Sequence, residues 1–319
     1  MSKPSLKVTI GIPTFNRLRY VQEAINSARK QTYDNVEIVV SDNASDDGTW
    51  RMLEQIDDPR LVLIRHKSNL GSAANLNTCL KKASGDLFLL LGDDDELAPE
   101  AIERLSAPFL SRIRGLPAER VGLAWCPCKI IDREGSDLWE TARGPGIESA
   151  ADFMVELFNG RRGPRLSGVL VRTEDALREG GYNQERYEAL CDTGLWGAVA
   201  LRYTSVVCVP EVLVRYRVHP NSHTSQSLCA DWQRWGRTLN GDLVAILQAQ
   251  GDKKGALRLR KAGRNLLANL TVDVLMRGIT RAGWWSGTLK EFWSSRAFML
   301  TPFVAKRILK DGWKLLRLK

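Results

Sequence analysis

Residues 87–99 read LFLLLGDDDELAP, an apolar run that stops at Gly92 and is followed at once by three aspartates. A short unbroken apolar run is typical of a strand buried on both faces, as in a parallel sheet. Ligands of open α/β sheets bind just outside the carboxyl ends of such strands. We therefore expect Asp93, Asp94 and Asp95 to stand at a ligand-binding edge.

Three adjacent carboxylates repel one another, so folding alone gives no reason to place them at a buried strand end. A divalent cation would neutralise them, and Mg²⁺ and Mn²⁺ prefer carboxylate oxygen while keeping coordination positions for phosphate. The alternative is a solvated acidic turn that precedes the next helix. The triplet taken by itself leaves both interpretations open.

Strands alternate with helices on both sides of this stretch. The apolar periodicity predicts strands over 6–13, 36–40, 61–65 and 87–91, and helices over 20–31, from 49 through 56, and over 72–83. Alternation at this spacing indicates βαβ units. We expect an α/β fold with a mainly parallel, Rossmann-like sheet flanked by helices.

The ends of the other strands also carry polar residues suited to a nucleotide. Thr14 and Asn16 follow the first strand, and Asp42 and Asn43 follow the second. No GxGxxG and no GxxxxGK[ST] occurs at any strand end, which argues against a dinucleotide fold and against a P-loop NTPase. A carboxylate on the base or ribose and a metal on the phosphates would hold the nucleotide instead.

Four segments, in this order and spacing, resemble the family-2 glycosyltransferases. They are IPTFNR (12–17), EIVVSDNASDDGT (37–49), NLGSAANLNTCL (69–80) and FLLLGDDDEL (88–97). The resemblance extends over about residues 6–220. It implies a GT-A fold and the transfer of a sugar, with inversion, from a nucleotide-diphospho-sugar such as a UDP-sugar. It further implies Mn²⁺ or Mg²⁺ as cofactor and a lipid-linked or glycan acceptor in cell-surface polysaccharide synthesis.

The same resemblance assigns roles to individual residues. Asp93 and Asp95 take the outer positions of a DXD-type metal motif, which favours the cation over the solvated turn, and Asp42 takes the position that contacts the donor's base. Asn43 departs from the second acidic position of the commoner DDGS and supplies no charge there. The positions implied to contact the donor are Pro13, Thr14, Asn16, Asp42, Arg65, Asp93, Asp94, Arg217 and His219; the last two belong to a YRxH-like ending that is expected to close as a lid.

Inversion requires a base on the acceptor side, because the attacking hydroxyl must lose its proton. In YEALCDTGLW (187–196) Asp192 precedes a predicted helix, where the simplest role for an aspartate is an N-cap. The stretch is similar to the ED-x-x-LW arrangement that holds the family's catalytic base. Cys191 replaces the first acidic residue of that arrangement, and Asp192 keeps the second. Asp192 is therefore the candidate base, with Glu188 in reserve.

Between these motifs the pattern predicts a helix over 98–109, a strand over 121–131, a helix over 150–158 and a strand over 166–171. Cys126 and Cys128 would point to the same side of the 121–131 strand. A CxC without histidine is more often core than metal site. The six scattered cysteines and three histidines also argue against structural zinc.

Charge divides the chain near residue 228. The whole chain carries a net charge of +9. The residues from 231 onward hold 18 basic and 6 acidic side chains, a net charge of +12, so the rest of the chain is slightly acidic. This predicts a catalytic domain over 1–228 and a basic helical region over 229–319, with helices over 232–250 and 254–277.

The last 40 residues mix tryptophan, phenylalanine and basic residues, a composition that favours the headgroup region of an anionic membrane. The alternatives are a helical cap on the catalytic domain or an interface between copies of the chain. No apolar run reaches the ~18–20 residues that span a bilayer. No signal peptide precedes the first strand. We expect a cytoplasmic protein bound peripherally to the inner face of the cell membrane.

Two other functions remain as alternatives. A nucleotidyltransferase would share the nucleotide-binding sheet, but IGIPTFNR (10–17) lacks the glycine-rich basic signature of those enzymes. A non-enzymatic nucleic-acid-binding protein would explain the basic tail, yet no nucleic-acid motif is present. Slow release of UDP from a UDP-sugar would distinguish a glycosyltransferase from a binding protein.

Overall fold

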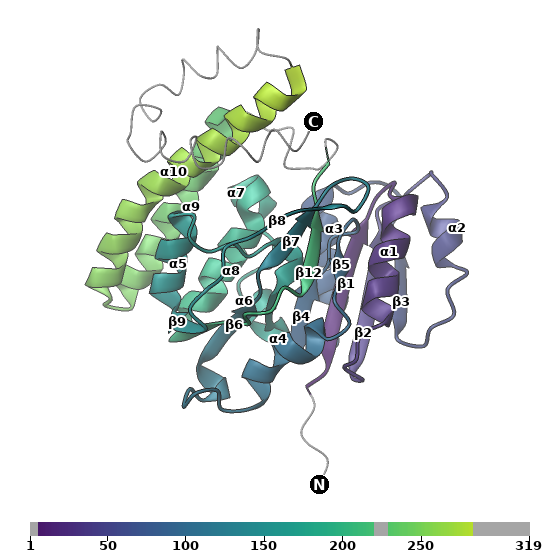
Figure 1. The fold of residues 1–319 in the computed structure, drawn as a ribbon, viewed down its shortest axis with the longest axis horizontal. Helices are drawn as coiled ribbons and strands as arrows, with labels where there is room; N and C mark the ends of the chain where they lie inside the picture. Colours follow the sequence, from purple (N-terminus) through teal and green to yellow (C-terminus); the bar gives the residue numbers. More distant parts are fainter. Residues whose placement is uncertain (1–5, 220–228, 283–319) are drawn as a thin grey trace.

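The computed structural model describes residues 6–219 and 229–282, and its centre is an eight-stranded sheet covered by helices (Figure 1). The first half of the chain supplies four neighbouring parallel strands in the order β3-β2-β1-β4. Its elements are β1 (Val8–Thr14), α1 (Leu18–Arg29), β2 (Val36–Asp42), α2 (Thr49–Leu53), β3 (Leu61–Arg65), α3 (Ser72–Lys82) and β4 (Leu87–Leu90). The prediction of an α/β fold with a mainly parallel sheet is confirmed.

The second half of the chain completes this sheet and adds a smaller one. Beyond β4 the large sheet continues with β10 (Val169–Arg172), β6 (Val121–Trp125), β11 (Ser205–Cys208) and β9 (Ile147–Ser149). The small sheet has the order β5 (Glu96–Leu97), β12 (Val214–Arg217), β7 (Cys128–Ile131) and β8 (Asp137–Glu140). Since β5 directly follows the aspartate triplet and pairs with β12, the small sheet brings Arg217 to the triplet.

The continuous strand predicted over 121–131 is wrong. It breaks after Trp125, so that β6 lies in the large sheet and β7 in the small one. Pro127 explains the break, because proline cannot donate a ladder hydrogen bond. Cys126 and Cys128 flank it in the buried core, where the Cys128 thiol faces the Cys126 carbonyl at 3.9 Å.

Alternate residues of the central strands face two hydrophobic cores. On β4, Leu87 and Leu89 pack in the core that contains α1 and α4 (Ala101–Leu110). Phe88 and Leu90 pack on the other face, with α3, α5 (Ala150–Phe158) and α8 (Cys191–Leu201). The strand is buried on both faces, as its unbroken apolar run predicts.

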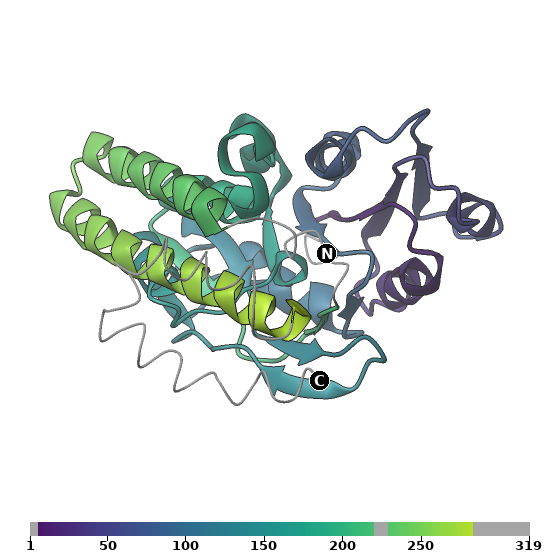
Figure 2. The same ribbon diagram turned by 90° about the horizontal axis from the view of Figure 1, so that it is seen from above.

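Two long helices, α9 (Cys229–Ala249) and α10 (Lys253–Ala282), run side by side at the end of the molecule away from α1 and α2 (Figures 1 and 2). Trp232, Leu243 and Leu259 on these helices share a core with Phe158 of α5 and Trp196 of α8. The helix α9 also lies beside α7 (Gln184–Tyr187). The described part of the predicted 229–319 region therefore packs on the sheet-bearing body, as a helical cap does.

The aromatic residues of the predicted membrane-binding tail, from Trp284 to Trp313, lie outside the described residues. Within residues 6–219 and 229–282, no helix combines the length and the hydropathy needed to cross a bilayer.

Candidate active site

Polar residues from the first strands meet at the carboxyl edge of the sheet. The register pairs Pro13 with Ser41, Thr14 with Asp42, and Asp42 with Arg65. Just after β4, the Leu91 N–H donates to the Gly11 carbonyl of β1 at 2.8 Å. The aspartate triplet begins two residues after Leu91, so it starts at the same edge of the sheet. Residues that the sequence placed at three separate strand ends thus share one edge.

Asp42 is fully buried at the end of β2. Its carboxylate accepts hydrogen bonds from the Ser45 hydroxyl and from the Ser45 N–H, the latter at 3.2 Å from Oδ2. The Arg65 Nε lies 3.7 Å from the same oxygen, and the Arg65 guanidinium sits 5.3 Å from the Trp50 ring centroid. Ser45, Trp50 and Arg65 also line a pocket of about 240 Å³ that opens beside Asp42.

The neighbouring Asn43 holds a loop instead of offering a charge. Its side-chain oxygen accepts the Leu70 N–H at 2.9 Å, and its amide donates to Asn69 Oδ1 at 2.8 Å. Asn16 makes a similar tie, because its N–H donates to Ser45 Oγ at 2.9 Å. These amides fix the loops that follow β1 and β2 relative to one another.

The triplet folds back on itself after Gly92. A Cβ at Gly92 would come 2.9 Å from Asp95 Oδ2, so the turn needs glycine. Ser167 bridges the two residues, since its hydroxyl donates to Asp95 Oδ2 at 2.5 Å and accepts the Gly92 N–H at 2.9 Å. The Arg217 N–H donates to the other oxygen, Asp95 Oδ1, at 2.8 Å. Asp95 is buried, and each of its two carboxylate oxygens accepts a hydrogen bond.

Burial and mutual repulsion raise the pKa values of these acids. Burial, with a further contribution from the charge of Asp94, raises the pKa of Asp93 to about 7. The same two causes raise the pKa of Asp95 well above that of an ordinary aspartate. Asp93, which is partly exposed, and Asp95, which is buried, both ionise with difficulty in the free protein, and a cation would stabilise their charged forms.

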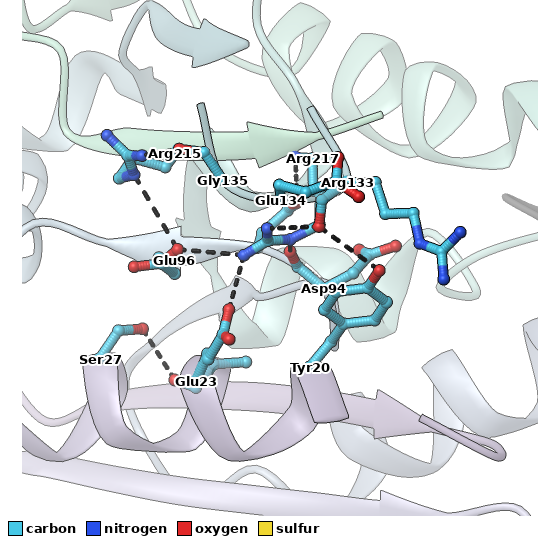
Figure 3. A network of polar contacts seen from close by, with 12 residues as sticks. Tyr20, Glu23, Ser27, Asp94, Glu96, Arg133, Glu134, Gly135, Arg215 and Arg217 are labelled. Carbon is cyan, nitrogen blue, oxygen red and sulfur yellow. Dashed lines mark hydrogen bonds and ion pairs between the residues drawn. The ribbon is translucent and has the colours of Figure 1, made fainter. Parts of the chain in front are cut away.

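The side chain of Arg217 is only 2% exposed and is occupied with protein partners (Figure 3). All three guanidinium nitrogens have acceptors, which are the Asp94 carbonyl for Nε, the Asp132 and Arg133 carbonyls for Nη1, and the Glu23 and Glu96 carboxylates for Nη2. His219 Nε2 lies 2.7 Å from Asp94 Oδ2, and its ring stacks on Tyr20 with centroids 5.8 Å apart. Through these contacts Arg217 and His219 hold Asp94, the middle residue of the triplet.

The described residues contain no group of three or more His, Cys, Asp or Glu side chains arranged as a metal site. Asp93 and Asp95 nevertheless fit a hard divalent cation of the Mg²⁺ type. Such ions are usually bound by one or two carboxylates and take their remaining ligands from substrate phosphates and water. The protein therefore has to supply only these two acids.

Asp192 lies in the first turn of α8, one residue inside the helix. The predicted helix start is displaced, and Leu190 rather than Asp192 occupies the N-cap position. The Asp192 carboxylate accepts the Thr193 N–H at 2.5 Å and the Thr193 hydroxyl at 3.1 Å. Burial raises its pKa above that of an ordinary aspartate, although the hydrogen bonds from Thr193 oppose the shift.

Tyr216 lies on β12, one residue before Arg217, and its phenol responds to charges on both sides of the site. Burial raises the pKa of the Tyr216 phenol, and the nearby charges of Asp95, Asp94 and Asp192 raise it further. The positive charge of Arg165 opposes this shift. The Arg165 guanidinium lies 5.8 Å from the Tyr216 ring centroid. The charges predicted on the donor side and on the acceptor side therefore both act on the Tyr216 phenol.

The reserve candidate Glu188 stands at the junction of α7 and α8 in a strained backbone conformation, with φ at 44° and ψ at −114°. Its carboxylate accepts a hydrogen bond from Gln184 Nε2 at 2.5 Å. Strained backbone of this kind tends to cluster at functional sites.

Sequence reasoning did not find Ser167, Arg165 or Tyr216 as site residues. Ser167 and Arg165 come from the loop that leads into β10, and Tyr216 from β12. Arg165 had the weak signal of a basic loop, Arg161-Arg162-Gly163-Pro164-Arg165. Nothing in the sequence places Ser167 or Tyr216 beside residues more than 70 positions away.

Comparison with known proteins identifies relatives of this chain. Residues 9–112 match the family model described as Glycosyl transferase family 2. An uncharacterized glycosyltransferase of Haemophilus influenzae is 28% identical over 227 residues, which cover 68% of this chain and 67% of that protein. The GalNAc(5)-diNAcBac-PP-undecaprenol beta-1,3-glucosyltransferase of Campylobacter jejuni is 32% identical over 162 residues. That match covers 48% of this chain and about half, 49%, of the relative.

Solved structures show the same fold. TarS 1-349 of S. aureus in complex with UDP-GlcNAc superposes with a TM-score of 0.58 at 17% identity, covering 86% of this chain and 82% of that one. The mannosyltransferase PcManGT of Pyrobaculum calidifontis, in complex with GDP-Man and Mn2+, has a TM-score of 0.55 at 18% identity, with coverage of 99% and 86%. At these identities the likeness establishes the fold alone, and it confirms the expected GT-A fold.

Proposed function

We propose that this chain, whose residues 9–112 match the model of glycosyl transferase family 2, moves a sugar, with inversion, from a UDP-sugar to a lipid-linked or glycan acceptor. The family match argues against the nucleotidyltransferase and nucleic-acid-binding alternatives. The observation that carries the proposal is that the strand ends bring Thr14, Asp42, Arg65 and the aspartate triplet to one edge of the sheet, as a nucleotide-diphosphate site requires. Donor and acceptor would meet between this edge and Asp192.

On the donor side, the pocket beside Asp42 would receive the nucleobase, because Ser45 and Arg65 both line it and hold that carboxylate. The Thr14 hydroxyl is buried at the same edge and interacts with Asp93, whose pKa it lowers against the effect of burial, so Thr14 would border the nucleotide beside the triplet. The choice of uridine is supported by the structural neighbour with UDP-GlcNAc.

The diphosphate would lie over Asp93 and Asp95, which would hold Mn²⁺ or Mg²⁺. That ion supplies charge neutralisation of the departing diphosphate. Ser167 and the backbone of Arg217 orient Asp95, and Arg217 and His219 hold Asp94. The bound Mn2+ of the mannosyltransferase neighbour supports the choice of a divalent ion.

On the acceptor side, Asp192 would take the proton from the attacking hydroxyl. A general base works best when its pKa is raised toward the operating pH, and burial shifts Asp192 in that direction. A lipid-linked acceptor is supported by analogy with the Campylobacter jejuni relative, whose name contains PP-undecaprenol.

An enzyme with a lipid-linked acceptor has to reach the membrane surface. An exposed face of α10 is suited to binding that surface. Lys253, Leu257, Arg260, Lys261 and Arg264 recur at helical spacing and are all exposed. The buried Ala256, Leu259 and Ala262 occupy the opposite face of the helix. This basic face, defined by the five exposed residues, would attract the anionic leaflet and hold the protein at the inner face of the membrane.

Release of UDP tests the proposal. We expect slow UDP release from a UDP-sugar in the presence of Mn²⁺, because water can replace the acceptor. Asp95→Asn should abolish the reaction and weaken donor binding while thermal unfolding shows an intact fold. Full activity of Asp95→Asn in EDTA would contradict the role of the metal, and no stabilisation of the protein by any nucleotide-sugar would contradict the donor site.

A further inference from the structure

A carboxylate on helix α9, that of Asp242, forms hydrogen bonds to the segment before Asp192. The Arg186 guanidinium donates from Nε and Nη2 to the two oxygens of Asp242, each at 2.6 Å. The Tyr187 hydroxyl donates to Asp242 Oδ2 at 2.7 Å. Bidentate charge-assisted bonds of this kind fix direction as well as distance.

Tyr187 passes this restraint to the first turn of α8. A Cβ at Gly194 would come 2.6 Å from Tyr187 Cδ2, so the ring rests directly on this glycine. Gly194 follows Asp192 by two residues in the same turn. Movement of the Tyr187 ring therefore moves the backbone that carries the Asp192 carboxylate.

The protonation states needed for these contacts persist through the neutral range. Burial and the neighbouring Asp242 raise the pKa of Tyr187 to about 12, so its hydroxyl remains a donor. Hydrogen bonds from Arg186 lower the pKa of Asp242, so its carboxylate remains charged.

The other side of the segment is tied to the nucleotide-binding half of the fold. Gln184 accepts the N–H of Ala73, in the first turn of α3, at 2.9 Å and donates to Glu188 at 2.5 Å. Residues 184–188 are thus held between α3 and α9. These restraints account for the unusual backbone of Glu188, which needs its surroundings to maintain it.

We propose that Asp242 is a positioning residue for the acceptor side of the reaction. Through Arg186 and Tyr187 it sets the place of Asp192, so that α9, which lies beyond the residues matched by the family model, is part of the catalytic machinery. The inference rests on the proposed role of Asp192 as the base.

The test is the effect of Asp242→Asn on the full-length protein with a UDP-sugar and Mn²⁺. The amide keeps the size of the side chain but loses the charge that holds Arg186. We expect kcat to fall by about 10–10²-fold, the range for displacing a reacting group by about 1 Å, with donor affinity unchanged. Tyr187→Phe should lower kcat in the same direction by less.

Asp231→Asn is the matched control, because Asp231 pairs with Arg234 on the same helix at 3.3 Å and both side chains are solvent-exposed. Its kcat should equal that of the unaltered protein. Gly194→Ala perturbs the same contact from the α8 side, and it should reproduce the loss of kcat with Asp242 in place. The double variant of Asp242→Asn with Tyr187→Phe should be no slower than Asp242→Asn alone, because the two groups act as one unit.

Unchanged kcat in both Asp242→Asn and Gly194→Ala would overturn the inference, as would an equal loss in kcat and in donor affinity. If Asp242→Asn does not fold, Tyr187→Phe and Gly194→Ala decide the question. Failure of the proposed function itself is distinguishable, since the unaltered protein would then release no UDP from a UDP-sugar, and failure of the base role would show as full turnover in Asp192→Asn.

Discussion

At the scale of single residues, the site is bordered by backbone that is strained to hold it. Asn16, Ala44 and Glu188 have φ values of 53°, 66° and 44°, in the left-handed region that only glycine adopts freely. Asn16 is compensated by its hydrogen bonds to the 42–47 loop, where its N–H donates to Ser45 and its side chain accepts from Asp46. Ala44 has no side-chain group to compensate it.

Ala44→Gly should therefore stabilise the protein. With alanine, the left-handed conformation destabilises the folded protein by about 1–2 kcal/mol. Glycine removes that cost, but its greater freedom in the unfolded chain cancels about 0.5–1 kcal/mol of the gain. We expect the free energy of unfolding in urea to rise by about 0.5–1 kcal/mol. Ala74→Gly, at an exposed position of α3, should lower it by about 1 kcal/mol. Equal destabilisation by both changes would mean that Ala44 is not strained.

At the scale of elements, the four parallel strands and their helices were predictable because each strand is a short, mainly apolar segment rich in Val, Ile or Leu, and a helical pattern follows it. The strand ends that meet at the site, at Thr14, Asp42 and Gly92, were predictable for the same reason. The 121–131 strand was mispredicted because the apolar pattern does not take account of Pro127. This proline interrupts the hydrogen bonding of the large sheet, and the chain continues in the small sheet. Ser167 and Tyr216 reach the site only through the pairing of β10 and β12, which no local pattern encodes.

Glu37 shows how one side chain joins several elements. Although burial opposes it, hydrogen bonding from Ser84, Thr9 and Lys7 lowers the pKa of Glu37 to about 2. The contacts link β2 to β1 and to the turn before β4. Because the pKa is lower in the folded state, this stability is present above pH ~4.3, the ordinary glutamate value, and is lost as the pH falls toward 2.

Glu37→Gln should lower the free energy of unfolding by about 1–3 kcal/mol at pH 7, because buried partners lose a charged acceptor. The difference between the two proteins should shrink in urea titrations at pH 3. Glu119→Gln, at an exposed glutamate, serves as the control and should change stability little at either pH. A pH-independent difference would exclude the charge of Glu37 as the cause.

At the scale of the whole molecule, charge and composition predicted a distinct basic region after residue 228 but not where it packs. Trp232 and Leu243 share a core with Trp196 of α8, a tertiary contact without a sequence signal. The basic face of α10 points away from that core, so the packed helices still leave a cationic surface. A cap and a membrane-facing surface are therefore compatible.

Vesicle binding tests this surface. Replacing Arg260, Lys261 and Arg264 together by alanine should weaken binding to anionic vesicles by about 10²-fold at low salt, since each cation contributes about 1 kcal/mol. The control replaces Lys81, Lys82 and Arg104, which are exposed on α3 and α4, and should bind as the unaltered protein does. Equal weakening by both sets would indicate non-specific attraction, and no binding at all would remove the membrane role.

We propose that a carboxylate on α8 removes the proton from the acceptor hydroxyl while the triplet holds the donor. Asp192→Asn tests this division of roles when its turnover and donor affinity are compared with those of the unaltered protein. We expect kcat to fall by about 10²–10⁴-fold, the range for losing a general base, with donor affinity nearly unchanged. Full turnover of Asp192→Asn, or an equal loss in donor affinity, would contradict it.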